Sequence, residues 1–95
     1  MIKVIAKNFA KENKIEKVLE LARELVEETV KEDGCIKYEM YQDQKNPSIL
    51  IMLEEWETIE AANKHMSSEH FKKIVPQMSE CMDQKPELNI CKKVI

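Results

Sequence analysis

The sequence predicts an α+β fold with the ferredoxin-like order β-α-β-β-α-β, an antiparallel sheet and helices on one face. Four segments show the period-two alternation or the apolar run of a strand, and the segments between them show helical spacing. The 95-residue chain is 43% hydrophobic with one glycine and three prolines, which is typical of a compact fold rather than of disorder. No repeat or low-complexity segment interrupts this order, so we expect a single domain over residues 1–95.

Residues 2–9 form the first predicted strand. Alternate side chains lie on opposite faces of a strand, which places one row of four together: Ile2, Val4, Ala6 and Asn8. Asn8 therefore ends an otherwise apolar face. A side-chain amide in such a place needs hydrogen-bond partners or a polar ligand.

A long helix is predicted next. Asn13 and Glu16 have the spacing of a capping box, and the apolar residues from Ile15 to Val30 recur at helical spacing. Gly34 is the only glycine in the chain, and glycine readily takes the left-handed conformation that commonly closes a helix. We therefore expect the helix to end at Asp33-Gly34.

Two strands are predicted at residues 35–42 and 48–56, joined by a turn at Asn46-Pro47. The first of them should place three side chains on one face: Ile36, Tyr38 and Met40. The second is apolar on both faces from residue 49 to 53, which is typical of a central strand covered on each side. Helices on one face leave the other face exposed, so we expect two sheets to pack face to face in a symmetric homodimer.

Two short helices and a strand complete the prediction. Thr58 is the expected N-cap of a helix over residues 59–66, and Ser67 or Ser68 is the expected N-cap of the next helix. Pro76 lies within that helix and is expected to break or kink it, because proline lacks an amide hydrogen and crowds the preceding turn. Residues 87–95 are expected to form the last strand.

Charge and hydropathy disfavour several classes of function. The formal net charge is −3, and 15 Lys and Arg are scattered among 18 Asp and Glu, so no basic stripe is available for nucleic acid. The longest apolar run, residues 49–53, is far shorter than the roughly 20 residues of a membrane-spanning helix, and the first residues resemble a strand rather than a signal peptide. We expect a cytoplasmic protein with no membrane span.

The three cysteines, Cys35, Cys81 and Cys91, are an odd set without a CxxC motif. This pattern favours reduced cysteines that pack as small hydrophobic residues over a disulfide framework or a structural zinc site, with a reactive thiol as the alternative. No GxGxxG, P-loop or dense ligand cluster is present, so no cofactor is expected.

Three motifs carry a resemblance to a known family: G-C-I-x-Y-E-x-Y from Gly34, E-E-W ending at Trp56, and H-M-x-S-x-H-F-x-x-x-x-P from His65. With them the chain resembles the antibiotic biosynthesis monooxygenase family, and most closely its quinol monooxygenase-like members. The resemblance implies a dimeric α+β barrel with a pocket between sheet and helices in each subunit. It also implies oxygenation of a small quinol or hydroxyaromatic by dioxygen without metal or flavin. A deprotonated electron-rich substrate can itself reduce dioxygen, so the protein supplies a base, polar anchors and a dry cavity.

His65 is the candidate catalytic residue. It lies on the same side of its helix as Ala61, Ala62 and Met66, facing the sheet, where an imidazole could take a proton from a phenolic hydroxyl or orient oxygen. The alternative is a ring that bonds nearby backbone at the helix end.

His70 is expected mainly to pack and cap at the first turn of the next helix, with substrate contact as the lesser possibility. The two histidines are five residues apart across a helix break, which matches no standard metal site, so we expect them to lie apart and to bind no metal.

The resemblance implies a substrate-binding role for Asn8, and the alternative is a hydrogen-bonding residue at a strand end. Trp56, Phe71 and one tyrosine would shape the pocket wall. Tyr38 and Tyr41 lie on opposite faces of their strand, so only one of them can line a given pocket, and dimer packing explains either equally well.

Other activities of the same family can be compared residue by residue. His65 stands where the haem-degrading members need a tryptophan, and Val75 stands where they need their haem-binding histidine, so haem degradation is disfavoured. A phosphosugar isomerase remains open, with Lys64, Lys72 and Lys73 as surface candidates for a phosphate. A non-catalytic dimeric barrel that binds a small ligand is the alternative from a different class.

Overall fold

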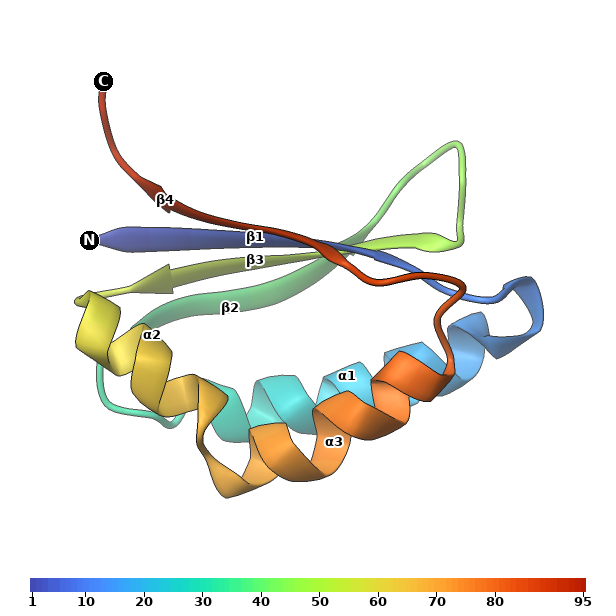
Figure 1. The fold of residues 1–95 in the computed structure, drawn as a ribbon, viewed down its shortest axis with the longest axis horizontal. Helices are drawn as coiled ribbons and strands as arrows, with labels where there is room; N and C mark the ends of the chain where they lie inside the picture. Colours follow the sequence, from blue (N-terminus) through green and yellow to red (C-terminus); the bar gives the residue numbers. More distant parts are fainter.

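The computed structural model describes residues 1–95 and contains four strands and three α-helices. In chain order these are β1 (Ile2–Phe9), a 3₁₀ turn η1 (Glu12–Lys14), α1 (Ile15–Thr29), β2 (Cys35–Gln42), β3 (Ile49–Trp56), α2 (Ile59–Met66), α3 (Glu69–Glu80) and β4 (Glu87–Lys92). The strands form one antiparallel sheet in the order β2-β3-β1-β4, and all three helices lie on one face of it (Figure 1). The predicted ferredoxin-like plan is confirmed. No helix has both the length and the apolar composition needed to cross a membrane.

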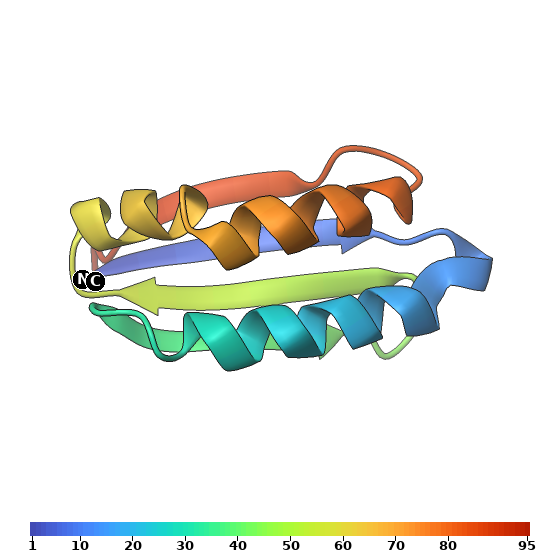
Figure 2. The ribbon, with the colours of Figure 1, turned by 90° about the horizontal axis from the view of Figure 1, so that it is seen from below.

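The helices divide the covered face of the sheet between them. Seen from the helical side, α1 lies over β2 and β3, whereas α2 and α3 lie over β1 and β4 (Figure 2). The apolar stripe of α1 is buried, as its helical spacing predicts: Val18, Leu21, Ala22 and Leu25. These side chains form the core together with the inward residues of the sheet.

β3 occupies the interior of the sheet, as its two apolar faces predict. Its inward residues are all buried: Leu50, Met52, Glu54 and Trp56. Its outward residues are only partly exposed. They lie beside apolar residues of β1, with Leu53 opposite Ile5 and Ile49 opposite Phe9. No helix covers this outer face in the single chain (Figure 1), and its apolar residues lie among charged ones, namely Lys3, Lys7 and Glu55.

The start of β2 departs from the predicted alternation. A β-bulge between Cys35 and Lys37 shifts the register by one residue. Tyr38 and Met40 face the helices as predicted, but Ile36 is 47% exposed, and Cys35 packs against the core instead. The prediction for Ile36 was therefore wrong because simple alternation does not anticipate an inserted residue.

The ends of α1 also differ from the prediction. Asn13 lies in η1, and the N-cap of α1 is Lys14 without a side-chain hydrogen bond, so the predicted capping box is absent. The helix ends at Thr29 rather than at Asp33-Gly34. Gly34 does have a positive φ of 84°, but it lies in the turn that leads into β2, where its carbonyl accepts a hydrogen bond from the backbone N–H of Glu57 at 2.8 Å.

Gly34 should tolerate no side chain. A Cβ at this position would lie 2.6 Å from the Cβ of Ala61, and the positive φ is itself unfavourable for other residues. We expect Gly34→Ala to lower the free energy of unfolding by about 2–4 kcal/mol, measured by urea denaturation. Adding Ala61→Gly should recover the part of the lost unfolding free energy that is due to the clash. A loss below about 1 kcal/mol would contradict this view of the turn.

Pro76 does not break the helix that contains it. α3 continues from Glu69 to Glu80, so the expected break is wrong. Proline cannot donate to the carbonyl of Lys72, but Lys72 is exposed and this carbonyl can be hydrated. The next carbonyl, that of Lys73, accepts a hydrogen bond from Nε2 of Gln77 at 2.9 Å.

Two side-chain caps separate α2 from its neighbours. The Thr58 hydroxyl accepts a hydrogen bond from the backbone N–H of Ala61, and the Ser68 hydroxyl accepts one from that of Phe71. The cap at Thr58 was predicted, and of the two serines predicted for the second cap the structure uses Ser68. The caps place His65 in the last turn of α2 and His70 in the first turn of α3.

Candidate active site

A cavity of about 200 Å³ lies between the sheet and the helices α2 and α3. Small side chains make room for it, notably Ala6 on β1 and Ala62 on α2. Thirteen of its 18 lining residues are hydrophobic, and the polar side chains in the lining are those of Asn8, Glu54, His65 and Ser79. Because an apolar cavity of about 150 Å³ can hold benzene, this one has room for a molecule of one or two aromatic rings.

His65 lines the cavity and is only 2% exposed. Its ring lies 5.0 Å from that of Tyr38, 4.9 Å from that of Trp56 and 5.1 Å from that of Phe71, measured between centroids. Burial in this aromatic surround lowers the pKa of His65 below its usual 6.5, although the neighbouring Glu32 opposes the shift. The imidazole is therefore neutral near pH 7.

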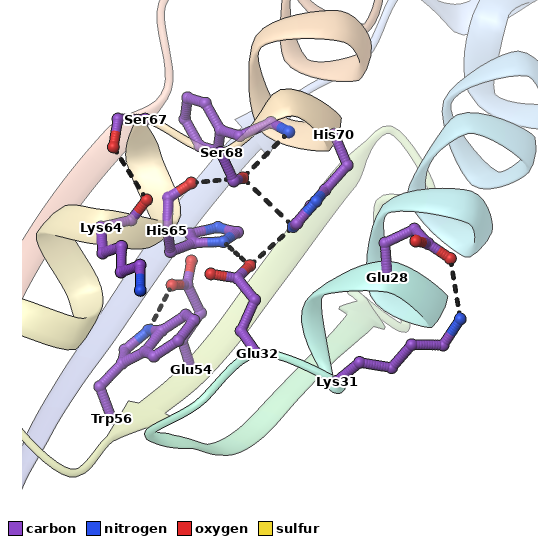
Figure 3. Close-up of polar contacts among 11 residues, drawn as sticks. Glu28, Lys31, Glu32, Glu54, Trp56, Lys64, His65, Ser67, Ser68 and His70 are labelled. Carbon is purple, nitrogen blue, oxygen red and sulfur yellow. Dashed lines mark hydrogen bonds and ion pairs between the residues drawn. The ribbon is translucent and has the colours of Figure 1, made fainter.

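Glu32 fixes which nitrogen of His65 carries the hydrogen. Its Oε2 lies 2.7 Å from Nδ1 of His65 and 2.7 Å from Nε2 of His70 (Figure 3). A carboxylate only accepts hydrogen bonds, so both of these nitrogens donate, and the neutral ring of His65 keeps a bare Nε2. This Nε2 is buried and has no partner in the protein. An unsatisfied acceptor on a residue that lines a cavity favours a ligand whose hydroxyl or N–H group can reach it.

The expected separation of the two histidines is wrong. Their ring centroids lie 6.0 Å apart, and both rings contact one carboxylate oxygen (Figure 3). The helix break brings them together because Ser68 folds the chain back, and its hydroxyl donates to the carbonyl of His65 at 2.7 Å. His70 is not among the residues that line the cavity, and its link to His65 runs through the shared carboxylate of Glu32.

Glu32, His65 and His70 are also the one group of side chains suited by type to a metal ion, with donor atoms within 4.8 Å of one another. Transition metals bind such donors at about 2.0–2.2 Å, which requires the donors to surround the ion. Here the nitrogen and oxygen atoms contact each other directly at 2.7 Å, which is the geometry of charge-assisted hydrogen bonds. Hydrogen bonding accounts for the arrangement of the three side chains.

Glu54 is a second titratable side chain in the cavity, and the sequence interpretation missed it. It is 8% exposed, and its Oε1 accepts a hydrogen bond from Nε1 of Trp56 at 3.0 Å (Figure 3). Burial raises its pKa from 4.5 to about 7; the Trp56 hydrogen bond opposes this shift and the charge of Glu32 adds to it. Near neutral pH, Glu54 is therefore present both as the acid and as the carboxylate.

The raised pKa of Glu54 predicts a pH-dependent stability. Between pH 4.5 and about 7 the unfolded chain releases a proton that the folded chain retains, so stability conferred at low pH is lost as the pH rises. Glu54→Gln cannot titrate, and its Oε1 can still accept from Trp56. Relative to wild type, we expect this variant to gain on the order of 3 kcal/mol of unfolding free energy between pH 4 and 8, measured by denaturant titration. A difference that is constant with pH would contradict the shift.

Asn8 also lines the cavity, and its substrate-binding role stays a prediction. Its Nδ2 donates to the carbonyls of Ala6 and Leu50 at 3.3 and 3.1 Å, so it does act as a hydrogen-bonding residue at a strand end. Only its Oδ1 is free to contact a ligand, as an acceptor.

The aromatic candidates fall into three positions. Tyr38 and Phe71 line the cavity, and burial raises the pKa of the Tyr38 phenol. Trp56 is fully buried beneath the site, where it contacts His65 and Glu54 without lining the cavity. Tyr41 is 52% exposed and bonds to Glu39, so Tyr38 is the tyrosine of this cavity.

Comparisons with known proteins place this geometry in context. Residues 1–77 match the sequence profile of the family described as antibiotic biosynthesis monooxygenase. The crystal structure of a conserved protein from Methanosarcina mazei Go1 is 47% identical, with a TM-score of 0.96 over 98% of this chain and 92% of that one. A crystal structure described as an antibiotic biosynthesis monooxygenase is 38% identical, with a TM-score of 0.96 over 100% of both chains.

A curated relative is longer than this chain. The uncharacterized protein sll1783 of Synechocystis is 27% identical over 90 residues, which make up 94% of this chain. The chain spans 61% of the length of that relative.

Proposed function

Because the chain belongs to the antibiotic biosynthesis monooxygenase family, we propose that it oxidises a small quinol or related hydroxyaromatic with dioxygen, using the substrate's own reactivity instead of a cofactor. The observation that carries this proposal is His65, which lines an apolar cavity and whose buried Nε2 has no partner in the protein. A phenolic hydroxyl is a donor of the kind that this nitrogen lacks. Tyr38 and Phe71 provide aromatic surfaces beside it.

The proposed reaction begins with proton transfer from the bound hydroxyl to Nε2 of His65. The imidazolium that forms donates from Nδ1 to the Glu32 carboxylate, which stabilises its charge. His70 holds the same carboxylate oxygen from the other side and so acts as a positioning residue. Asn8 would accept a hydrogen bond from a second polar group of the substrate.

The deprotonated substrate can then transfer an electron to dioxygen, and recombination of the two radicals forms a carbon–oxygen bond. The peroxide anion that results takes the proton back from the His65 imidazolium, which gives a hydroperoxide and a neutral His65. Overall, a hydroquinone and one dioxygen give a hydroxyquinone and one water. The hydrophobic lining supports this step, since it keeps polar groups that could react with the intermediates away from them.

The same cavity disfavours a phosphosugar substrate. Its lining contains no lysine or arginine, and Lys64, Lys72 and Lys73 are exposed outside it. A phosphate would be buried there without a cationic partner, which is unfavourable.

We also propose that the active protein is a homodimer built from this one domain over residues 1–95, with the apolar outer faces of two sheets in contact. That face carries Ile5, Phe9, Ile51 and Leu53, all partly exposed in the single chain. An antiparallel sheet with a wet outer face would have polar residues at these positions.

Oxygen uptake with a panel of one-ring and two-ring hydroquinones tests the proposed function. We expect uptake above the autoxidation rate for at least one member, with one atom of labelled dioxygen in the product. Uptake equal to autoxidation across the panel would overturn the proposal. Saturable binding without turnover would then indicate a ligand-binding barrel, and conversion without oxygen would indicate an isomerase.

A further inference from the structure

We propose that Glu54 is the proton donor of this site and acts with His65 to eliminate water from an aromatic hydroperoxide that carries a hydrogen on its peroxidic carbon. Such a hydroperoxide is the species that forms when dioxygen adds to a ring carbon, so this inference rests on the proposed function and deepens it. Nothing in the proposed proton abstraction uses Glu54.

The geometry places the two groups at one end of the cavity. Glu54 rises from β3, in register with Val4 on β1 and Tyr38 on β2, and His65 descends from α2. Both contact the indole of Trp56, whose ring lies 4.9 Å from that of His65 and whose Nε1 lies 3.0 Å from Glu54 (Figure 3). Both also line the cavity, so a molecule bound at this end can contact both groups.

Hydrogen bonding assigns opposite proton roles to the pair. Glu32 binds the Nδ1–H of His65 and leaves its Nε2 as a base. The N–H of Trp56 occupies Oε1 of Glu54, so the hydrogen of the protonated carboxyl belongs on Oε2, which has no bond to the protein. Burial separately favours the protonated form of Glu54 and the neutral form of His65.

The reaction step is a concerted elimination. Nε2 of His65 takes the hydrogen from the peroxidic carbon as a proton, and the electron pair of that C–H bond becomes the second bond of the new carbonyl. The O–O bond breaks, and the outer oxygen leaves with its electron pair and takes the proton of Glu54 to become water. The hydroperoxide R₂CH–OOH thus gives R₂C=O and H₂O with no external oxidant. Return of the proton from imidazolium to the Glu54 carboxylate restores the pair.

Protonation by Glu54 matters because the cavity is apolar. Hydroxide leaving into such a space without a proton would be an unsolvated anion, which is strongly unfavourable. Without the acid, we expect the hydroperoxide to persist and to leave the site unconverted.

The test supplies a two-ring hydroperoxide, tetralin hydroperoxide, under argon and measures formation of the ketone. We expect the wild-type protein to accelerate ketone formation and Glu54→Gln to lower that rate by about 100-fold or more. Deuterium on the peroxidic carbon should slow the wild-type reaction. The matched control is Glu55→Gln, the next residue of β3 on the opposite face of the sheet, which should react like wild type. Cumene hydroperoxide has no hydrogen on that carbon and should yield no ketone by this route.

Two outcomes would overturn the proposal: a wild-type rate equal to that in buffer, or a Glu54→Gln rate equal to that of wild type with the fold confirmed by circular dichroism. The result also separates this inference from the proposed function. Ketone formation without oxygen uptake on any quinol would support the acid–base pair and reject the oxygenation. Oxygen uptake with an unchanged product yield in Glu54→Gln would support the oxygenation and reject the role of Glu54.

Discussion

Replacing His65 by glutamine is expected to lower the oxygen-dependent turnover of a quinol by about 10²–10⁴-fold, the usual contribution of a positioned general base. Glutamine can still donate an amide hydrogen to Glu32, but it has no nitrogen that takes up a proton near pH 7. The measurement is the initial rate of oxygen uptake at saturating substrate, corrected for autoxidation. Thermal unfolding should show a folded variant, since the side chain is shortened by little and remains polar.

Glu32→Gln tests the hydrogen bond between Glu32 and Nδ1 of His65. A glutamine amide beside Nδ1 can donate to it, which would move the hydrogen of His65 to Nε2 and remove the acceptor from the cavity. We expect a loss of turnover together with weaker binding of phenolic ligands. Glu28→Gln is the matched control, because Glu28 bonds only to the exposed Lys31. If His65→Gln or Glu32→Gln kept more than half of the wild-type turnover, His65 would not be the base.

Local sequence patterns were sufficient for most of the fold. Alternation, helical spacing and the caps at Thr58 and Ser68 depend on residues a few positions apart, and these predictions are confirmed. The contact of Glu32 with His65 and His70 spans 33 and 38 residues of sequence. It arises because α1 ends early, at Thr29, and a turn carries Glu32 beneath the junction of α2 and α3. No local pattern predicts that position.

Glu54 differs from Glu32, because the sequence pattern does indicate its position. The interpretation did not use that pattern. The alternation of β3 places Glu54 in one row with Leu50, Met52 and Trp56, and a carboxyl group in a buried row needs a partner or a function. The same argument singled out Asn8 at the end of β1, and the structure places Asn8 in the cavity. A buried charged residue within a strand is thus as informative as a polar residue at its end.

A charge on the outer face of the sheet is expected to weaken the proposed dimer strongly. Leu53 lies near its middle, paired with Ile5 on β1 and Glu39 on β2. In a two-fold symmetric dimer each substitution occurs twice in the same interface. A glutamate there would lose its hydration in both subunits, and the nearest cations on β1, Lys3 and Lys7, already contact Glu55 and Phe9. We expect a cost of several kcal/mol, and each 1.4 kcal/mol weakens association tenfold.

We therefore expect Leu53→Glu to convert a dimer into a monomer at micromolar concentration, with a dissociation constant raised by about 10³-fold or more. Light scattering during size-exclusion chromatography measures the mass directly. The matched control is Val30→Glu, which places the same charge at a 52% exposed position beyond α1, on the helical side of the sheet. A Leu53→Glu variant that remains dimeric, or a monomeric wild type, would show that this face is not the dimer interface.

The same variant separates assembly from chemistry. The cavity lies on the opposite side of the sheet, and its polar groups all belong to one chain: Asn8, Glu54, His65 and Ser79. A folded Leu53→Glu monomer should therefore still bind a phenolic ligand, with any loss of affinity due to looser packing of β1 and β3 between the two faces. Complete loss of binding in a folded monomer would instead mean that the partner subunit completes the site.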